Sequence, residues 1–319
     1  MSTAWQRVRV SNEAVSGRFG PHFVYLLGMD PASDAMFDEG QRSGLIAMVG
    51  RPNVGKSSLV NAICGRKVSI VSDKPQTTRH RVMGVLDRES VQLVFVDTPG
   101  LHKPVSALGE RVNATALESA GDVDVQCLVL DATREFGRGD RWVADRMDPS
   151  RLVVVVNKAD IAGPDRVLAA LAASAVLDAG AYFPVSAKTG DGVEALVDHL
   201  VGLMPSGPRW FNDGEANDMP QELWVAELVR EQLLAVVHDE LPYSIATRVT
   251  DWEWPRIRCE ILVERESQKG MVIGRGGLVL REVGRRVRAQ LPEGAFIELR
   301  VRVDKDWQRR PDRVERLGY

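Results

Sequence analysis

An eight-residue glycine-rich stretch, Gly50 to Ser57, lies between an apolar segment and an amphipathic one. It reads GRPNVGKS, follows the apolar residues 45–49 and opens into a helical pattern over residues 56–63. The pattern G-x-x-x-x-G-K-[ST] in this context is typical of a loop whose backbone N–H groups surround phosphate oxygens. Lys56 suits the β- and γ-phosphates, and the Ser57 hydroxyl suits Mg²⁺. The motif therefore predicts a strand–loop–helix unit that binds a nucleoside triphosphate, without indicating the base.

A second motif, Asn157 to Asp160, indicates the base. It reads NKAD and follows the continuous apolar run 152–156, which is typical of a buried parallel strand. The Asp160 carboxylate can accept from two adjacent ring N–H groups, which the Watson–Crick edge of guanine offers and that of adenine does not. Asn157 offers a donor and an acceptor, and the Lys158 stem can lie along the base plane. The two motifs together predict GTP and GDP as ligands.

Three further polar stretches lie beside strand-like runs. Residues 97–100 (DTPG) follow the apolar run 91–96, so that Asp97 can hold Mg²⁺ through a water and the Gly100 N–H can meet the γ-phosphate. Residues 76–79 (QTTR) offer a hydroxyl for the Mg²⁺ shell, and residues 186–188 (SAK) offer backbone N–H groups to the guanine carbonyl. Each stretch alone would fit a plain turn as well as a nucleotide site, but their order along one chain favours a GTPase site.

The N-terminal two thirds of the chain alternate between strand and helix patterns. Strand-like runs near residues 45, 82, 91, 125, 152 and 181 are separated by helical patterns near residues 56, 108, 141, 165 and 193. This alternation predicts an α/β fold with a mostly parallel sheet, whose ligand loops lie at the carboxyl ends of the strands, where we expect all five motifs. Residues 205–220 have the composition of a linker.

The pattern changes after Gln221. A helical pattern to about His238 precedes strand-like runs over 243–249 and 257–263, a glycine-rich turn, a basic helix and a strand over 295–303. The GxxG turn from Gly274 to Gly277 is of the kind that clamps about four single-stranded nucleotides. From residue 265 to 319, Lys and Arg outnumber Asp and Glu by 14 to 8 in a chain of net charge −3. This local excess favours RNA binding over a simple helix cap.

Length and composition agree with a two-domain intracellular protein. The 319 residues have room for about two domains. Cys64, Cys127 and Cys259 show no paired spacing, so neither a disulfide framework nor a zinc site is indicated, and a reducing cytosol fits. No apolar run approaches the roughly 18 residues needed to span a bilayer. Residues 1–43 lack the apolar core of a secretory signal, and we assign them no function.

The order of the motifs resembles that of the translation-factor-related bacterial GTPases, since GRPNVGKS, QTTR, DTPG, NKAD and SAK follow one another along this chain. The sequence SIVS at 69–72 before QTTRHR narrows the resemblance to the Era family. The helix–strand–strand–helix–helix–strand order after residue 221 resembles a type II KH domain. ELPYS at 240–244 and VERESQKG at 263–270 also resemble Era closely. The two resemblances cover nearly all of the chain beyond Arg42.

The resemblance implies four segments and a function. It implies an extension over 1–43, a P-loop GTPase domain over 44–205, a linker over 206–220 and a smaller α+β KH RNA-binding domain over 221–319. It further implies slow Mg²⁺-dependent GTP hydrolysis coupled to assembly of the small (30S) ribosomal subunit, with binding to the 3′ region of 16S rRNA and not to DNA. We expect a cytoplasmic monomer, for which peripheral association with the inner face of the cell membrane stays open.

The same resemblance assigns the site residues by group. The phosphate-binding residues are Gly50, Arg51, Pro52, Asn53, Val54, Gly55, Lys56, Ser57 and Ser58. Switch I is Gln76, Thr77, Thr78, Arg79 and His80, and switch II is Asp97, Thr98, Pro99, Gly100 and Leu101. The guanine-binding residues are Asn157, Lys158, Asp160, Ser186, Ala187 and Lys188, and the RNA-binding residues are Lys269, Gly274, Arg275, Gly276, Gly277, Arg281 and Arg285.

Within these groups, Ser57, Thr78 and (through a water) Asp97 are the expected Mg²⁺ ligands. In related GTPases with an asparagine at the position of Asn53, a K⁺ ion lies against the phosphates, which makes K⁺ a candidate second cation. Leu101 stands where small signalling GTPases carry a glutamine that orients the attacking water, and its apolar side chain cannot polarise water.

Two alternatives remain at this stage. One is a different ribosome-associated GTPase, such as one acting on the large subunit. The other is an RNA-binding chaperone with a vestigial nucleotide site, which the intact Lys56, Ser57, Asp97 and Asn157 argue against.

Overall fold

The computed structural model describes residues 7–10, 35–38, 40–74, 76–102, 104, 106–121, 123–212, 219–237 and 241–319. Most of the expected extension and residues 213–218 of the expected linker therefore lie outside the described residues. Chain contacts define two compact units. The first comprises Met1–Ser69, Arg81–His102 and Thr115–Asp218, and the second comprises Ile70–His80, Lys103–Ala114 and Met219–Tyr319.

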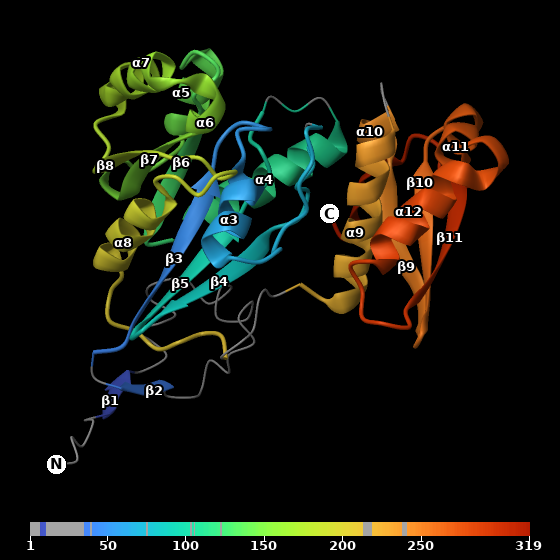
Figure 1. Ribbon diagram of the computed structural model, residues 1–319, viewed down its shortest axis with the longest axis horizontal. Helices are drawn as coiled ribbons and strands as arrows, with labels where there is room; N and C mark the ends of the chain where they lie inside the picture. The colour runs from blue at the N-terminus through green and yellow to red at the C-terminus, as the bar shows by residue number, and fades with distance from the viewer. Residues whose placement is uncertain are drawn as a thin grey trace. The chain divides into compact units, whose positions relative to one another are not determined.

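A six-stranded sheet in the order β4-β5-β3-β6-β7-β8 forms the centre of the first unit (Figure 1). The strands are β3 (Arg42–Val49), β4 (Val82–Arg88), β5 (Val91–Asp97), β6 (Val125–Asp131), β7 (Leu152–Asn157) and β8 (Ala181–Pro184). All neighbours are parallel except β4 and β5, which form an antiparallel hairpin. The expected mostly parallel sheet is thereby confirmed. The central strands read as apolar runs because both of their faces are buried.

Helices connect these strands as the periodicity predicts. They are α3 (Lys56–Cys64), α4 (Ala107–Gly121), α5 (Arg138–Ala144), α7 (Pro164–Ser174) and α8 (Val193–Leu203), with a short α6 (Ala159–Ala162) that the sequence did not indicate. Separately, two short strands, β1 (Arg7–Val10) and β2 (Ala35–Asp38), pair antiparallel.

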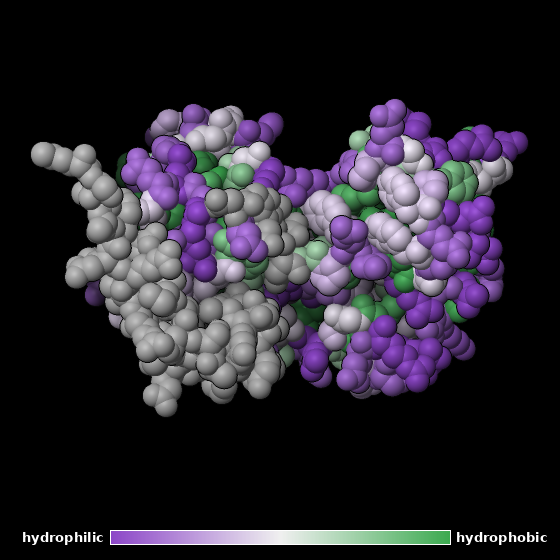
Figure 2. All heavy atoms as spheres, turned by 90° about the horizontal axis from the view of Figure 1, so that it is seen from below, coloured by the Kyte–Doolittle hydropathy of each residue, from purple (hydrophilic) through white to green (hydrophobic). Residues whose placement is uncertain are grey.

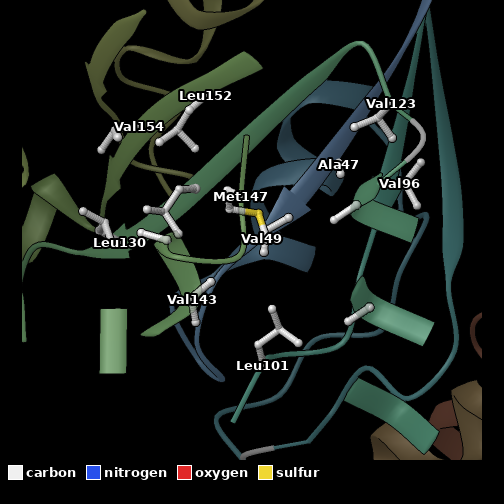
Figure 3. Close-up of a cluster of buried hydrophobic side chains, with 14 of the residues drawn as sticks. Ala47, Val49, Val96, Leu101, Val123, Leu130, Val143, Met147, Leu152 and Val154 are labelled. Carbon is white, nitrogen blue, oxygen red and sulfur yellow. The ribbon is translucent and has the colours of Figure 1, made fainter. Parts of the chain in front are cut away.

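The core of the first unit lies where the sheet meets its helices. Figure 3 shows Val49, Leu130, Val143 and Met147 pointing toward one another from β3, β6, α5 and the segment after α5. Burying each such side chain contributes about 1.5–3 kcal/mol. Leu101 belongs to the same cluster. The coloured part of the surface visible in Figure 2 is mostly hydrophilic, as expected when the apolar side chains are buried in the core.

The second unit has a three-stranded sheet in the order β11-β10-β9. Its strands are β9 (Ala246–Glu253), β10 (Arg256–Val263) and β11 (Phe296–Val303), and its main helices are α9 (Gln221–Val236), α11 (Glu266–Ile273) and α12 (Leu278–Arg288). β10 runs antiparallel to β9 and parallel to β11. The predicted helix–strand–strand–helix–helix–strand order is confirmed. Buried residues of the helices and of β10, such as Leu228, Val283 and Ile261, share one core.

Three details of the second unit differ from the sequence prediction. The strand expected from Tyr243 begins at Ala246, because Leu241–Ser244 form a short helix, α10, whose second residue is a proline that suits a first helical turn. α9 ends at Val236, and His238 lies outside the described residues. The expected basic tail contains a helix, α13 (Pro311–Arg316), preceded by Trp307, which is fully buried and donates its indole N–H to the Ser244 carbonyl at 2.9 Å.

Candidate functional site

The phosphate loop connects β3 to α3. Gly55 stands before the first residue of α3 with φ of 95° and makes no side-chain cap hydrogen bond, so the first turn of α3 keeps backbone N–H groups available for an anion. A Cβ on Gly55 would meet the Asn157 amide, and a Cβ on Gly50 would meet the Val129 carbonyl. Both positions therefore require glycine, for conformation and for close approach.

Lys56 lies inside this loop. Its side chain is buried, with 6% of the residue exposed, and Nζ donates to the carbonyls of Gly50 and Arg51 at 3.1 Å each. Burial lowers the pKa of Lys56 to about 8, and the Asp97 carboxylate opposes that shift. A buried cation beside uncapped helix N–H groups is an arrangement that an anionic phosphate stabilises.

The DTPG loop is docked against the phosphate loop. Asp97 ends β5 and is fully buried, and the Thr98 hydroxyl donates to the Met48 carbonyl at 2.7 Å. The Leu101 N–H donates to the Gly50 carbonyl at 3.1 Å, while a Cβ on Gly100 would collide with Pro52. The Leu101 side chain is 1% exposed and belongs to the core, so the structure gives it no access to a nucleotide or to a water beside one.

Asn157 joins three of the predicted motifs. Its amide N–H₂ donates to the Val54 carbonyl of the phosphate loop at 2.9 Å. Its amide oxygen accepts from the Ala187 N–H of the SAK loop at 3.0 Å. Asn157 is only 2% exposed. Its side chain thus holds the phosphate loop, the NKAD loop and the SAK loop together, a positioning task in addition to the base contact expected from the sequence.

The other residues of the NKAD motif are also fixed. The Ser186 hydroxyl donates to Asp160 Oδ1 at 2.9 Å, which orients the carboxylate expected to read guanine. Lys158 Nζ donates to the Asn53 carbonyl at 2.7 Å and to Asp131 Oδ2 at 2.6 Å. These two bonds anchor the head of Lys158, so that its aliphatic stem is held rigidly beside the expected base site.

Asp131 is a site residue that the sequence reasoning missed. It ends β6, accepts from Thr133 as well as from Lys158, and its side chain is 4% exposed. Burial raises the pKa of Asp131, but hydrogen bonds from Lys158 and Thr133 outweigh burial and lower it below its ordinary value. The missed signal was the same as for DTPG, namely an aspartate directly after an apolar strand.

Two donors, one from α3 and one from the end of β5, fit Mg²⁺. Ser57 lies in the first turn of α3 and Asp97 at the end of β5, which gives one hydroxyl and one carboxylate. Over the described ranges there is no cluster of three or more His, Cys, Asp or Glu side chains that would form an all-protein metal site. Mg²⁺ is usually held by one or two protein ligands together with substrate phosphates and waters, and this pair meets that requirement.

The predicted switch I residues belong to the second unit. There Arg79 is 2% exposed, donates to the Ile245 carbonyl at 2.7 Å and lies over the rings of Trp307 and Tyr319. The His80 ring stacks on Tyr319 with centroids 4.7 Å apart. Ser57 and Asp97 belong to the first unit, so a Mg²⁺ contact of Thr78 stays a prediction. Gln76 departs from ordinary backbone geometry, with φ of 60°.

A buried ion pair holds the same segment. Arg230 of α9 is fully buried, pairs with Glu227 at 2.5 Å and also donates to the Thr77 carbonyl. Removing one partner of a buried pair of this kind costs several kcal/mol. Residues 77–80 are therefore fixed within the second unit by charged groups from α9 and by aromatic rings near the end of the chain.

The GxxG turn lies between α11 and α12. Gly274, Gly276 and Gly277 have φ of 72°, 60° and 76°, in the region that favours glycine. A Cβ on Gly276 or Gly277 would meet nothing within 4 Å, so the backbone there is open to a ligand. Gly277 stands before the first residue of α12 without a side-chain cap, which leaves helix N–H groups for a phosphate.

Basic side chains surround this turn. Arg275 and Arg281 are exposed, and Lys269 of α11 is half-buried. Arg285 pairs with Glu282 at 2.8 Å, and Arg286 shares the same carboxylate at 2.7 Å. Hydrogen bonds from these two arginines lower the pKa of Glu282 to about 2. One acid thus offsets part of the positive charge of α12, and Arg275 and Arg281 stay exposed beside the turn.

The fold and these two sites define a P-loop GTPase joined to a KH domain. The "50S ribosome-binding GTPase" family matches residues 45–158, and the "KH domain" family matches residues 240–308. The chain is 44% identical over 296 residues to GTPase Era of Mycobacterium tuberculosis (strain ATCC 25618 / H37Rv), covering 87% of this chain and 98% of that protein. GTPase Era of Mycobacterium avium (strain 104) is 43% identical. This chain belongs to the Era family of GTPases.

Two solved structures are similar over both units. One is Era in complex with MgGDPNP and nucleotides 1506–1542 of 16S ribosomal RNA, with a TM-score of 0.84 and 34% identity, covering 88% of this chain and 99% of that one. The other is a single-residue variant of Aquifex aeolicus Era bound to GDP·AlF₄⁻, with a TM-score of 0.83 and 34% identity over the same shares. The expected fold and the expected GTPase activity are confirmed.

Proposed function

We propose that this chain is a Mg²⁺-dependent GTP switch that binds the 3′ region of 16S rRNA through its KH domain and acts in assembly of the 30S subunit. The observation that carries the nucleotide half is the Asn157 side chain, whose two hydrogen bonds join the phosphate loop, the NKAD loop and the SAK loop. The RNA half is supported by the open GxxG backbone and by the Era structure that holds nucleotides 1506–1542 of 16S rRNA.

Each residue group has a defined task in this proposal. Lys56 and the first turn of α3 bind the β- and γ-phosphates, and Asp160 selects guanine. Ser57, Asp97 and Thr78 are the proposed residues for Mg²⁺, which supplies positive charge beside the phosphates when it is bound. Because Leu101 is buried in the core, water must be positioned by backbone groups, by a cation or by a partner, and slow intrinsic turnover follows.

We further propose that K⁺ binds at Asn53. In this loop Asn53 has φ of 64°, and its carbonyl is held by Lys158. A monovalent cation against the phosphates would offset the charge that develops during hydrolysis. The proposal rests on family analogy together with this constrained backbone.

The experiment that tests the enzymatic function compares GTP turnover of the wild type, Lys56→Ala and the surface control Lys305→Ala. We expect Lys56→Ala to lose nearly all turnover and the control to keep it. Wild-type turnover no higher than that of Lys56→Ala, with intact RNA binding, would instead support the RNA chaperone with a vestigial site. Competition between small- and large-subunit rRNA fragments separates 30S assembly from the large-subunit alternative.

The cellular setting is also a proposal. We propose a cytoplasmic monomer that reaches 30S particles directly. Over the ranges that the structure describes, no helix is long and apolar enough to cross a membrane. Peripheral membrane association is tested by fractionation of cells at low and high salt.

A further inference from the structure

One face of the three-stranded sheet carries a group of arginines. Ile257, Cys259 and Ile261 of β10 are buried in the core shared with α9, α11 and α12, which lie on one side of the sheet (Figure 1). Alternate residues of a strand point to opposite faces, so their neighbours point away from these helices. Near Leu262 this second side is covered by Trp307 and Leu317. We call the remaining, uncovered part the open sheet face, and the arginines that this side of the sheet carries are Arg248, Arg256, Arg258, Arg300 and Arg302.

Two carboxylates on the open sheet face are shared by arginines of neighbouring strands. Glu260 pairs with Arg248 and Arg302 at 2.6 Å each. Glu298 pairs with Arg300 at 2.9 Å and with Arg258 at 3.3 Å. Each of these carboxylates therefore meets two guanidinium groups, and the pairs leave positive charge in excess.

Two further carboxylates lie toward the end of β9. Asp251 lies 2.5 Å from Arg258, and the exposed Glu253 stands opposite Arg256 in the β9–β10 register. Five arginines thus share the open sheet face with four carboxylates, so that the face keeps a net positive charge.

These arginines remain available to an anionic ligand. The side chains of Arg300 and Arg302 are 65% and 67% exposed. The Glu260 carboxylate is buried, so its two pairs have a structural role, whereas the more exposed Arg300–Glu298 pair contributes little to stability. Each guanidinium has five donors and uses only one or two in the pairs described. Phosphate oxygens can occupy the rest, in the planar geometry that arginine favours.

Exposed aromatic rings lie at one end of the same face. Phe296 is 50% exposed and stands opposite Arg256 in the β10–β11 register. Trp254, in the turn before Arg256, is 52% exposed, and the Phe296 N–H donates to the Pro255 carbonyl at 2.8 Å. Aromatic rings next to arginines are what single-stranded nucleic acids bind, because bases stack on the rings while phosphates meet the charges.

β11 connects the GxxG helices with the open sheet face. β11 is an edge strand of the sheet, and both α11 and α12 contact it. The GxxG turn connects these two helices. A clamp of this kind holds about four nucleotides, so the adjoining nucleotides of a longer RNA need a further surface.

We propose that the open sheet face is a second RNA-binding surface that holds the nucleotides adjoining the GxxG clamp. The phosphates bind Arg256, Arg300 and Arg302, and a base stacks on Phe296. Alternate residues along β11 are about 7 Å apart, which is comparable to the distance between consecutive phosphates of a nucleic-acid chain. The proposal rests on the RNA binding proposed above for the KH domain.

The test measures binding of two fluorescent single strands from the 3′ end of 16S rRNA, one of about four nucleotides and one of about twelve. The variants are Arg256→Gln/Arg300→Gln, Phe296→Ala and, as a matched control on the first unit, Arg166→Gln. Circular dichroism and GTP turnover verify that each variant is folded.

For Arg256→Gln/Arg300→Gln we expect about 10-fold or more loss for the long RNA, and a salt slope smaller by about 1.4 for two lost phosphate contacts. Binding of the short RNA stays unchanged. Phe296→Ala loses affinity for the long RNA without changing the salt slope, because stacking releases no counterions. The control behaves as the wild type.

Long-RNA affinity and salt slope equal to wild type in both variants would overturn the second surface while leaving the GxxG clamp intact. A wild type that binds neither RNA would overturn the proposed RNA function and this surface with it. If the arginine double variant does not fold, Phe296→Ala decides, since Phe296 is half exposed and lies outside the core.

Discussion

At the scale of single residues, Asp160 is the residue that we expect to determine the choice of base. Its carboxylate is oriented by the Ser186 hydroxyl at 2.9 Å. In Asp160→Asn one carboxylate oxygen is replaced by an amide N–H₂ group, which donates instead of accepting. One of the two guanine N–H groups therefore loses its hydrogen-bond acceptor. We expect GTP affinity to fall by roughly 100-fold or more and xanthine nucleotides to be accepted. Competition binding with GTP, XTP and ATP measures this, and wild-type protein that binds ATP as well as GTP would contradict the assignment of the NKAD motif.

Lys56 should take up a proton when nucleotide binds. Burial lowers the pKa of Lys56 to about 8, whereas the ordinary value is 10.5. As the pH rises, Lys56 loses its proton in the folded state at a lower pH than in the unfolded state. The free energy of unfolding of the nucleotide-free protein should therefore increase between about pH 8 and 10.5. A bound phosphate favours the charged amine and raises the pKa again. Calorimetric titration with GDP at about pH 8.5, in two buffers of different ionisation enthalpy, should reveal proton uptake that is absent in Lys56→Arg. Identical heats in both buffers argue against it.

The K⁺ site proposed at Asn53 predicts that turnover depends on the monovalent cation. We expect GTP hydrolysis to be several-fold faster in KCl than in NaCl at equal ionic strength, because a bound K⁺ offsets charge in the transition state. Asn53→Ala should turn over GTP equally slowly in both salts. Steady-state phosphate release measures the rates, and equal wild-type rates in the two salts would remove K⁺ from the proposal.

At the scale of elements, we expect the turn between α11 and α12 to make the primary RNA contact. Arg275→Asp/Gly276→Asp places two carboxylates where phosphates are expected, and the positive φ of Gly276 adds strain. RNA binding should fall below detection, while GTP turnover of the free protein stays near wild type, since the phosphate loop and the NKAD loop lie in the first unit. Arg166→Asp serves as the control for added negative charge. Loss of turnover together with RNA binding would point to misfolding or to a shared site.

Individual helices and strands also show which sequence patterns predict secondary structure correctly. The continuous apolar run 152–156 predicted β7 (Leu152–Asn157) correctly, because strands that are buried on both faces consist mainly of apolar residues. The short α10 was missed, because four residues are too few for a periodicity and its Leu241–Ser244 run reads equally well as a strand. QTTR was expected at a carboxyl strand end, but it precedes β4. Because β4 runs antiparallel to β5, its first residue, Val82, pairs with Asp97 at the carboxyl end of β5. QTTR therefore precedes a strand that begins at the edge of the sheet where the ligand loops were expected.

At the scale of the whole molecule, we expect the switch I segment to be the element through which nucleotide and RNA affect each other's binding. Thr77 and Arg79 are held by Arg230 and by the Ile245 carbonyl within the second unit. If γ-phosphate and Mg²⁺ reorder residues 76–80, those contacts must change, and linkage requires RNA to alter GTP affinity by the same factor as GTP alters RNA affinity. We expect tighter RNA binding with a non-hydrolysable GTP analogue than with GDP.

The measurement for this coupling is RNA affinity in both nucleotide states at one fixed salt concentration. Thr78→Ala should bind the RNA with the same affinity in both states, because it lacks the hydroxyl expected on Mg²⁺. Thr250→Ala, on the exposed part of β9, is the matched control and should still distinguish the states. Equal wild-type affinities would mean two independent modules on one chain.

The sequence by itself determined the strand–loop–helix unit, the base and the order of the KH elements. These depend on local composition and on motifs whose chemistry is contained in a few neighbouring residues. Only the tertiary structure decided that Asn157 joins three loops, that Asp131 anchors Lys158 and that Arg230 holds Thr77, because each contact joins residues far apart in the chain. The open sheet face was equally hidden, since its arginines come from three strands and become one surface only through pairing in register.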